Sequence, residues 1–204
     1  MKRTRVFQIL SRLMIVALPV TLFGCLSPVQ VEPSTTYVLS SKPHMAVKKS
    51  INKINLLVAP MDTATIYNTD QIAYTSHPYQ VAYFAKSYWA AKPAKMLQSL
   101  IIQSLQDTHY FHAVNASPAM GKYDFILVTQ LVQLQQDFLS QPSLLRLTVR
   151  AQLINARNNS IVATKQFSVI EPTVQNTPYG GVQAANKAVN KVLRQIGLFC
   201  MNTI

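Results

Sequence analysis

The residues of this 204-residue chain that could carry out chemistry are few and scattered. Among seven Asp and Glu residues and four histidines, only His109 and His112 form a close pair, with Asp107 nearby. Such a pair could bind a metal from one helical face, but the local pattern indicates a helix end and a short strand, so ordinary histidines are favoured. No G-x-S-x-G, P-loop, H-E-x-x-H or paired-cysteine motif occurs. We therefore expect no enzyme, no metal site and no cofactor.

Cys25 is the residue whose position indicates a covalent modification. Residues 1–13 carry four cations and no acid, and the apolar run Met14–Phe23 is shorter than the roughly 20 residues that span a bilayer. The sequence Leu-Phe-Gly-Cys at 22–25 resembles a lipoprotein signal, in which the thiol receives a diacylglycerol and becomes the new N-terminus after cleavage. The alternative is an ordinary signal peptide with an incidental cysteine.

Lipidation of Cys25 would fix both the location and the organisation of the chain. Each buried methylene of an acyl chain contributes about 0.8 kcal/mol, so a cysteine with several chains, palmitate among them, is a firm anchor. Leu26 stands where an aspartate would, by the same resemblance, retain the protein at the inner membrane. We therefore expect the periplasmic face of the outer membrane, with a signal peptide at 1–24, a lipidated tether at 25–36 and one domain at 37–204.

The excess of basic residues is smaller in the expected mature chain than in the whole sequence. The formal net charge is +12, but without the four cations of the leader it is 15 − 7 = +8. Export makes a nucleic-acid partner unexpected. The cations Lys86, Lys92 and Lys95 flank an aromatic segment, and Arg146 and Arg150 share one strand face. They are either solvated surface charges or a surface attracted to anionic lipid headgroups.

Aromatic residues concentrate just before a predicted helix, at Tyr83, Phe84, Tyr88 and Trp89. One interpretation is a core edge that packs against the helix. The other is a docking or lipid-contacting surface, because exposed aromatic side chains anchor interfaces. Tyr83, Tyr88 and Trp89 are the candidate surface residues, with Trp89 the first of them to test.

Cys200 follows the last predicted helix. It is either a small buried apolar residue or, because a lipidated Cys25 leaves it no internal partner, half of an intermolecular disulfide.

Apolar periodicity then gives the elements that position these residues. A long run apolar on both faces at 123–134 predicts a central strand, and residues 145–153 alternate apolar and polar, as in a strand with one buried face. Further strands are expected at 37–41, 51–58, 71–76, 80–84, 111–114 and 161–170. The segments 71–76 and 80–84 would form a hairpin, and 161–170 would pair with 145–153.

Two helices complete the expected fold. Pro93 starts a helix whose apolar face includes Leu97, Ile101 and Leu105 and which ends near 108–110. Thr177 can cap a second helix, although two glycines favour a regular start nearer Val182. Strands followed by helices predict an α+β fold, a mainly antiparallel sheet with both helices on one face.

The order and spacing of these segments resemble the ABC-type transport auxiliary lipoproteins, a family that includes the paraquat-inducible operon outer-membrane lipoprotein. The resemblance runs from about Thr36 to Leu198. It rests on the segments 36–39, 54–60, 70–74, Trp89 before a proline-started helix, 123–127 and 161–163. One departure is Lys92, which stands where the family has an acidic residue before the proline.

The resemblance implies a non-enzymatic auxiliary subunit of an intermembrane lipid-transport system. Its partners would be an MCE-domain periplasmic protein and, in some systems, ABC transporter subunits. The long strands with one polar face are also compatible with a homo-oligomer. The alternatives are a structural lipoprotein of a lipopolysaccharide, pilus or secretion apparatus, and a periplasmic hydrolase, which would need histidine beside Asp107 or Asp124 in a cleft.

Overall fold

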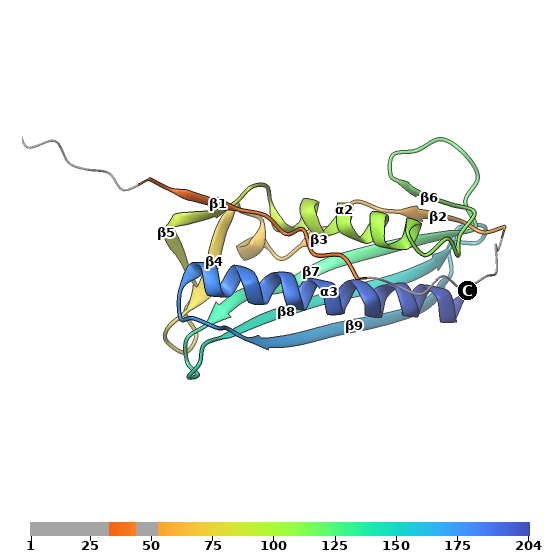
Figure 1. Cartoon of the computed structure of the whole chain (residues 1–204). Helices are drawn as coiled ribbons and strands as arrows, with labels where there is room; N and C mark the ends of the chain where they lie inside the picture. The colour runs from red at the N-terminus through yellow and green to blue at the C-terminus, as the bar shows by residue number, and fades with distance from the viewer. Residues whose placement is uncertain (1–32, 44–52) are drawn as a thin grey trace, which may run out of the picture. The chain divides into compact units, whose positions relative to one another are not determined.

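The computed structural model describes residues 33–43 and 53–204. Their compact unit spans Ser34–Ile204, and it contains nine strands, one 3-10 helix and two α-helices (Figure 1). In chain order these elements are β1 (Thr35–Tyr37), β2 (Asn55–Val58), β3 (Asp62–Thr63), η2 (Thr65–Tyr67), β4 (Gln71–Thr75), β5 (Ala82–Trp89), α2 (Pro93–Gln106), β6 (Ala113–Ala116), β7 (Phe125–Asp137), β8 (Leu144–Asn155), β9 (Ile161–Pro172) and α3 (Pro178–Thr203).

β7 is the centre of the sheet, as its apolar pattern predicted. One of its edges pairs antiparallel with β8 from Phe125 to Asp137, and β8 pairs antiparallel with β9. The expected hairpin of β4 and β5 is also present. β8 buries Leu145, Leu147 and the other alternate residues of its inner face, which confirms the expected one-sided strand.

The other edge of β7 shows that the expectation of a mainly antiparallel sheet was wrong. Here β2, β3 and β4 lie in succession along β7, and all three are parallel to it. With the parallel pairs β1–β5 and β2–β6, the sheet is mixed. Parallel neighbours need a crossover connection, and α2 is part of the long connection from β2 to its parallel neighbour β6. Apolar periodicity indicates which face of a strand is buried but not the direction of the neighbouring strand. The parallel pairing could therefore not be predicted from the sequence.

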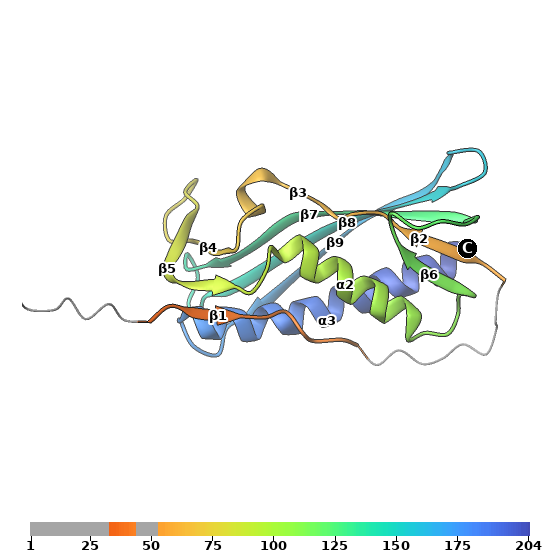
Figure 2. The same cartoon turned by 90° about the horizontal axis from the view of Figure 1, so that it is seen from above.

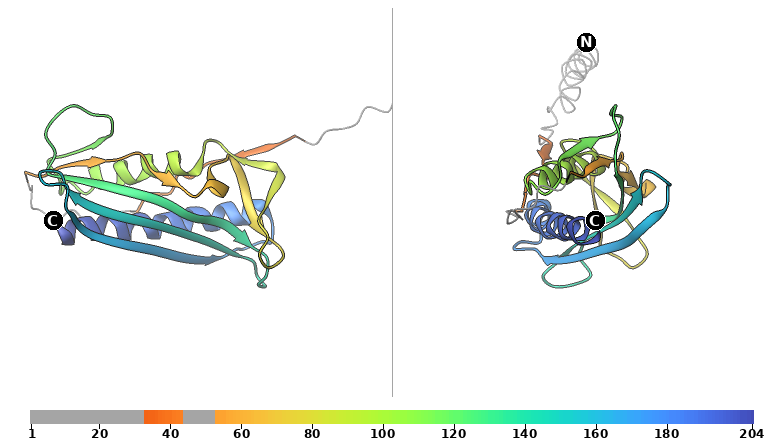
Figure 3. Two further views of the ribbon diagram at one scale, coloured as in Figure 1. Left: turned by 180° about the vertical axis from the view of Figure 1, so that it is seen from behind. Right: turned by 90° about the vertical axis from the view of Figure 1, so that its right-hand side faces the viewer.

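Both helices pack on one face of the sheet, as expected (Figure 2). The sheet curls around them, as the end-on view shows (Figure 3). The apolar stripe of α3 is fully buried, from Val182 through Val189 to Ile196, and Leu97, Ile101 and Leu105 of α2 are each 1% exposed. Burying a side chain of this size stabilises the fold by about 1.5–3 kcal/mol. The helices are therefore held chiefly by this shared core.

The start of α3 differs from the expectation because its glycines are needed for packing. The helix begins at Pro178, capped by the Thr177 hydroxyl, which accepts a hydrogen bond from the Gly180 N–H at 3.1 Å. A Cβ on Gly180 would lie 2.1 Å from the Gln175 carbonyl oxygen. A Cβ on Gly181 would lie 2.3 Å from Oε1 of Gln136. The glycines therefore allow close approach at the first turn and do not delay the helix.

The segment that follows β1 is fastened to α3 by asparagine side chains. Oδ1 of Asn186 accepts hydrogen bonds from the backbone N–H groups of Ser40 and Ser41, at 2.9 and 3.1 Å. Its amide Nδ2 donates to the Val38 carbonyl at 3.1 Å. Asn190 Nδ2 donates to the Ser41 hydroxyl at 3.2 Å. Residues 38–41 are therefore bound to the helix through their backbone.

Candidate functional site

Cys25 lies outside the described residues, and the three aromatic candidates lie on β5. Trp89 is only 4% exposed and belongs to the core, while its backbone N–H donates to the Asp70 carbonyl at 2.6 Å. Tyr83 and Tyr88 are half-buried, and their hydroxyls donate to the carbonyls of Ile66 and Ala85, both at 2.8 Å. The structure thus brings the tyrosines partly to the surface and keeps the indole beneath it.

A more exposed group of side chains lies where three connections meet at one end of the sheet. Register places Thr75, Asp137, Leu144 and Pro172 in one row across β4, β7, β8 and β9. The segments 76–81, 138–143 and 173–177 therefore emerge together (Figure 1). We call these segments, with the first turn of α3, the three-turn end.

Hydrogen bonds join the segments of the three-turn end to one another. The Phe138 N–H donates to the Thr75 carbonyl at 2.8 Å, and the Thr173 N–H donates to the Ser143 carbonyl at 2.9 Å. Asn176 accepts from the Ser143 N–H and donates to Gln141, both at 2.9 Å. These bonds make the three segments one joined surface.

The tips of this end expose apolar side chains. Tyr79 is 107% exposed, Val174 72%, Tyr179 53% and Leu139 52%. Segments 76–81, 138–143 and 173–177 contain no Asp, Glu, Lys or Arg. Turns ordinarily carry polar and charged residues, so uncharged segments tipped with Tyr, Leu and Val are an unusual surface. These residues give no signal in the sequence, because single apolar residues in turns show no periodicity.

Three aromatic rings form a cluster beside the tips. The ring of Tyr74 stacks on Phe84 at 4.5 Å between centroids and meets Phe138 edge-on at 5.9 Å. Phe84 and Phe138 also meet edge-on at 6.3 Å. Each pair of this kind contributes about 0.5–1.5 kcal/mol beyond area burial. The cluster therefore ties the β4–β5 hairpin to the β7–β8 turn.

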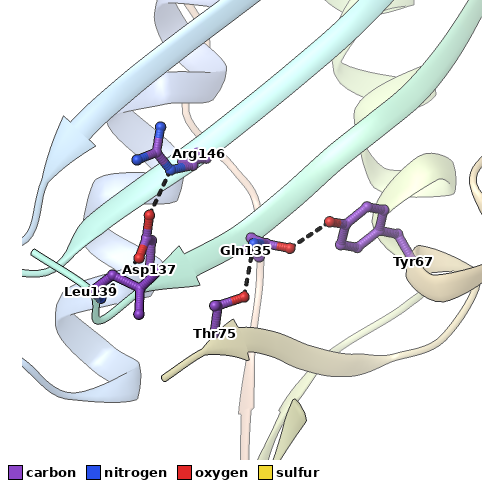
Figure 4. A network of polar contacts seen from close by, with 6 residues as sticks. All are labelled: Tyr67, Thr75, Gln135, Asp137, Leu139 and Arg146. Atoms are coloured by element: carbon purple, nitrogen blue, oxygen red, sulfur yellow. Dashed lines mark hydrogen bonds and ion pairs between the residues drawn. The ribbon is translucent and has the colours of Figure 1, made fainter. Parts of the chain in front are cut away.

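A polar network holds the end of β7 in place (Figure 4). Asp137 accepts from Arg146 Nε at 2.7 Å and from the Leu139 N–H at 2.9 Å. Gln135 bridges two elements, accepting from the Tyr67 hydroxyl at 2.6 Å and donating to the Thr75 hydroxyl at 3.0 Å. Burial, with a smaller effect of the nearby Tyr83, raises the pKa of Tyr67 to about 12, so this hydroxyl remains a donor at neutral pH.

The carboxylates near the three-turn end are not available at its surface. Asp137 is 5% exposed and bonded as above, and Glu171 is 7% exposed and ion-paired with Lys191. The charged side chains next to the three segments are therefore ion-paired, Arg146 with Asp137 and Lys191 with Glu171, and the segments 76–81, 138–143 and 173–177 themselves carry no Asp, Glu, Lys or Arg.

A groove lies along the outer edge of the sheet, apart from the three-turn end. β9 pairs only with β8, so among the described residues its other edge carries no strand. A groove of about 540 Å³ runs between β9 and α3, and its apolar lining is Phe167, Leu198 and Phe199. Leu198 is 45% exposed. The rest of the lining is polar and includes Lys165, Gln195 and Asn202. An unpaired strand edge beside a groove with apolar and polar lining is a surface that another chain can extend.

Among the described residues, the remaining titratable side chains form no metal-binding cluster. The parts of the chain that the structure describes contain no group of three or more His, Cys, Asp or Glu placed to hold a metal. Asp124 lines a cleft of about 370 Å³ with Lys53, Phe125 and Arg157, and no described histidine lines it. The Asn55 N–H and the Arg157 guanidinium lower the pKa of Asp124, as in a structural latch between β2 and β7.

A mixed sheet with two helices on one face makes this chain an α+β domain, and comparison with known proteins then gives its family. The family model for the ABC-type transport auxiliary lipoprotein component matches residues 37–197. The chain belongs to the ABC-type transport auxiliary lipoprotein family.

Solved structures share this fold at low sequence identity. Protein XCC0632 from Xanthomonas campestris, of the DUF330 family, is 18% identical with a TM-score of 0.74, covering 83% of this chain and 96% of its own. An uncharacterised protein is 12% identical with a TM-score of 0.68, covering 83% of this chain and 99% of its own. A search of curated proteins found no match. Among the described residues, no helix is long and apolar enough to cross a membrane.

Proposed function

We propose that this chain is a non-enzymatic auxiliary lipoprotein of an intermembrane lipid-transport system, anchored through Cys25 to the periplasmic face of the outer membrane. The observation that carries the proposal is the family match over residues 37–197, which follows a leader at 1–24 and the tether that begins at Cys25. Residues 1–24 are the signal peptide, 25–36 the lipidated tether and 37–204 the working domain.

The mechanism is tethering. The acyl chains hold the domain at the membrane, and its surface captures an MCE-domain periplasmic protein and, through it, the subunits of an ABC transporter. The family description supports the transport role. The half-buried Tyr83 and Tyr88, with Trp89 packed beneath, form the docking surface for that partner.

Copies of the chain associate through β9. Its unpaired edge and the groove beside Leu198 offer backbone groups and apolar surface together, which is the combination that strand addition uses.

Metabolic labelling with radiolabelled palmitate tests the anchor. The wild-type chain incorporates label and fractionates with the outer membrane, whereas Cys25→Ala does neither. Equal incorporation into both would refute lipidation at Cys25.

Crosslinking in cells, followed by mass spectrometry of a C-terminally tagged copy, tests the transport role. MCE-domain or ABC transporter subunits among the crosslinked proteins are the expected result. Lipopolysaccharide, pilus or secretion components in their place would support the alternative of a structural lipoprotein and refute the transport role.

A further inference from the structure

We propose that the three-turn end is a second, non-covalent membrane contact, which places Tyr79, Leu139, Val174 and Tyr179 in the headgroup region of the phospholipid leaflet that holds Cys25. This inference rests on the proposed lipid anchor. It adds a defined orientation of the domain and a lipid-binding surface formed by the protein itself.

The direction of β1 places this end toward the anchor. β4 is parallel to β7, β5 is antiparallel to β4, and β1 is parallel to β5, so β1 runs away from the three-turn end. The chain therefore enters β1 from the side of that end, as Figures 1 and 2 show. Residues 26–33 separate Cys25 from Ser34, and a fully extended tether of that length reaches about 30 Å. Cys25 is therefore tied within about 30 Å of the start of β1, a distance from which the three-turn end reaches the membrane surface.

The exposed apolar side chains gather at this end more than elsewhere. Of the twelve large apolar side chains that the described residues expose, half lie on or beside it: Tyr79, Val81, Leu139, Ile170, Val174 and Tyr179. Tyrosine favours the membrane interface because its ring is apolar and its hydroxyl remains hydrated. The absence of charge from segments 76–81, 138–143 and 173–177 removes the desolvation penalty that a charged turn would meet there.

The backbone of Tyr79 supports a role for its exposed ring. Tyr79 has a φ of +65°, in the left-handed region that a bulky residue rarely adopts. A strained residue that exposes its whole side chain gains no packing within the chain to offset the strain. Such positions are concentrated at binding sites. The clustered rings of Tyr74, Phe84 and Phe138 hold the hairpin that presents it.

The opposite end of the sheet has a different character. Its connections carry Asp107, Lys122, Asp124 and Arg157. Among the described residues, Met120 there matches Tyr79 in exposure, at 101%, and Ile161 and Val162 at the start of β9 are 60% and 43% exposed. A charged end is suited to water or to a protein partner, and an uncharged, aromatic end to lipid. The domain therefore stands with its three-turn end on the leaflet and its charged end toward the periplasm.

A fluorescent label on the lipidated full-length protein tests this orientation. With Cys25 acylated and Cys200 fully buried, Tyr79→Cys is the reactive thiol to which an NBD fluorophore attaches. The protein is reconstituted in phosphatidylethanolamine and phosphatidylglycerol vesicles, and flotation confirms the anchor before the label is read. We expect blue-shifted, several-fold brighter emission that lipids with a doxyl group near the headgroup quench. The matched control, Met120→Cys, is expected to show neither change.

Two outcomes would overturn the proposal. One is a Tyr79→Cys label that behaves like the Met120→Cys label although the protein floats with the vesicles. The other is a Tyr79→Cys label that responds only when envelope proteins are added, which would make the three-turn end a protein-docking surface. Failure to float is a separate result, because it concerns the anchor of the proposed function.

The unacylated Cys25→Ala chain provides a measurement that does not depend on the anchor. Replacing Leu139 or Val174 by Ser is expected to lower its partition into the same vesicles by roughly three- to tenfold. Because the turns are uncharged, the loss is expected to be equal at low and high salt, whereas attraction of lysines to anionic lipid would be screened. Both side chains are exposed, and far-UV circular dichroism checks the fold. Partition unchanged in both variants would also refute the proposal.

Discussion

Cys200 shows how strongly burial changes the chemistry of one side chain. It is fully buried in the core, and burial raises the pKa of its thiol to about 12. A neutral, inaccessible thiol is a poor nucleophile. This supports the interpretation of Cys200 as a buried apolar residue over the intermolecular disulfide.

The reactivity of Cys200 is a direct prediction. In the Cys25→Ala chain Cys200 is the last remaining cysteine. We expect Ellman's reagent at pH 8 to leave it unmodified in the folded protein and to react with one thiol per chain after denaturation in guanidinium. Rapid reaction of the folded protein, or a disulfide-linked dimer on a non-reducing gel, would contradict this burial.

Asp124 gives the fold a defined dependence on acid. Its carboxylate accepts from the Asn55 N–H at 3.0 Å and from Arg157 Nη2 at 3.1 Å, and these bonds lower its pKa below the ordinary aspartate value of 3.8. A lowered folded pKa contributes stability above the unfolded pKa. That stability is lost as the pH falls through 3.8 toward the lower folded value.

The prediction is that Asp124→Asn removes part of this acid sensitivity. Urea unfolding between pH 7 and pH 3 should show a smaller loss of stability for the variant than for the wild type. Asp62→Asn is the control, because Asp62 lies on β3 and accepts from the Gln130 amide at 3.0 Å, with no cation in that contact. Parallel pH profiles of wild type and Asp124→Asn would show that the latch contributes nothing.

Trp89 is expected to act through stability because its ring lies in the core at 4% exposure. Trp89→Ala should lower the free energy of unfolding by about 3–5 kcal/mol. Tyr88→Phe, which removes one hydroxyl bonded to the Ala85 carbonyl, should cost about 1 kcal/mol or less. Chemical denaturation separates the two. A stable Trp89→Ala protein that fails to crosslink to its partner would instead assign Trp89 a direct binding role.

At the scale of elements, the first turn of α3 depends on glycine. Alanine normally improves a helix by about 1 kcal/mol over glycine, but a Cβ on Gly180 would lie 2.1 Å from the backbone oxygen of Gln175. We expect Gly180→Ala to destabilise the protein by about 1–3 kcal/mol, as overpacking does. Gln183→Ala, at an exposed position of the same helix, should be neutral or slightly stabilising. Thermal unfolding of both variants measures these effects. A raised melting temperature for Gly180→Ala would show that the segment containing Gln175 shifts to make room for the added Cβ.

Helices and strands with a strong apolar period could be predicted from the sequence, but the strands that pair with them in parallel could not. The buried stripes of α2 and α3, the central β7 and the β8–β9 hairpin follow from local spacing, since each pattern records which side of one element avoids water. The parallel pairs of β7 with β2, β3 and β4 depend on contacts between segments far apart in the sequence. The three-turn end was missed for the same reason, because Tyr79, Leu139 and Val174 become neighbours only through the register of the sheet.

At the scale of the whole molecule, the open edge of β9 governs association between copies. Leu198 is exposed in the groove beside β9, so Leu198→Glu should leave the fold intact and place a charge where a second chain would pack. We expect light scattering after size exclusion to show a shift to smaller species for Leu198→Glu. Gln183→Glu, which lies on α3 outside the groove lining, should not shift. A monomeric wild type would remove the basis for this association.

The hydrogen bonds between Asn186 and residues 38–41 affect how the domain resists a mechanical force. A pull on an N-terminal tether acts along β1, so the β1–β5 pair is sheared along its length, and shear breaks several hydrogen bonds at once. Asn186 also binds Val38, Ser40 and Ser41 to α3, which transmits the pull to a helix buried along its whole apolar face. A partner that moves in the periplasm would therefore strain the membrane anchor before it peeled the first strand from the sheet.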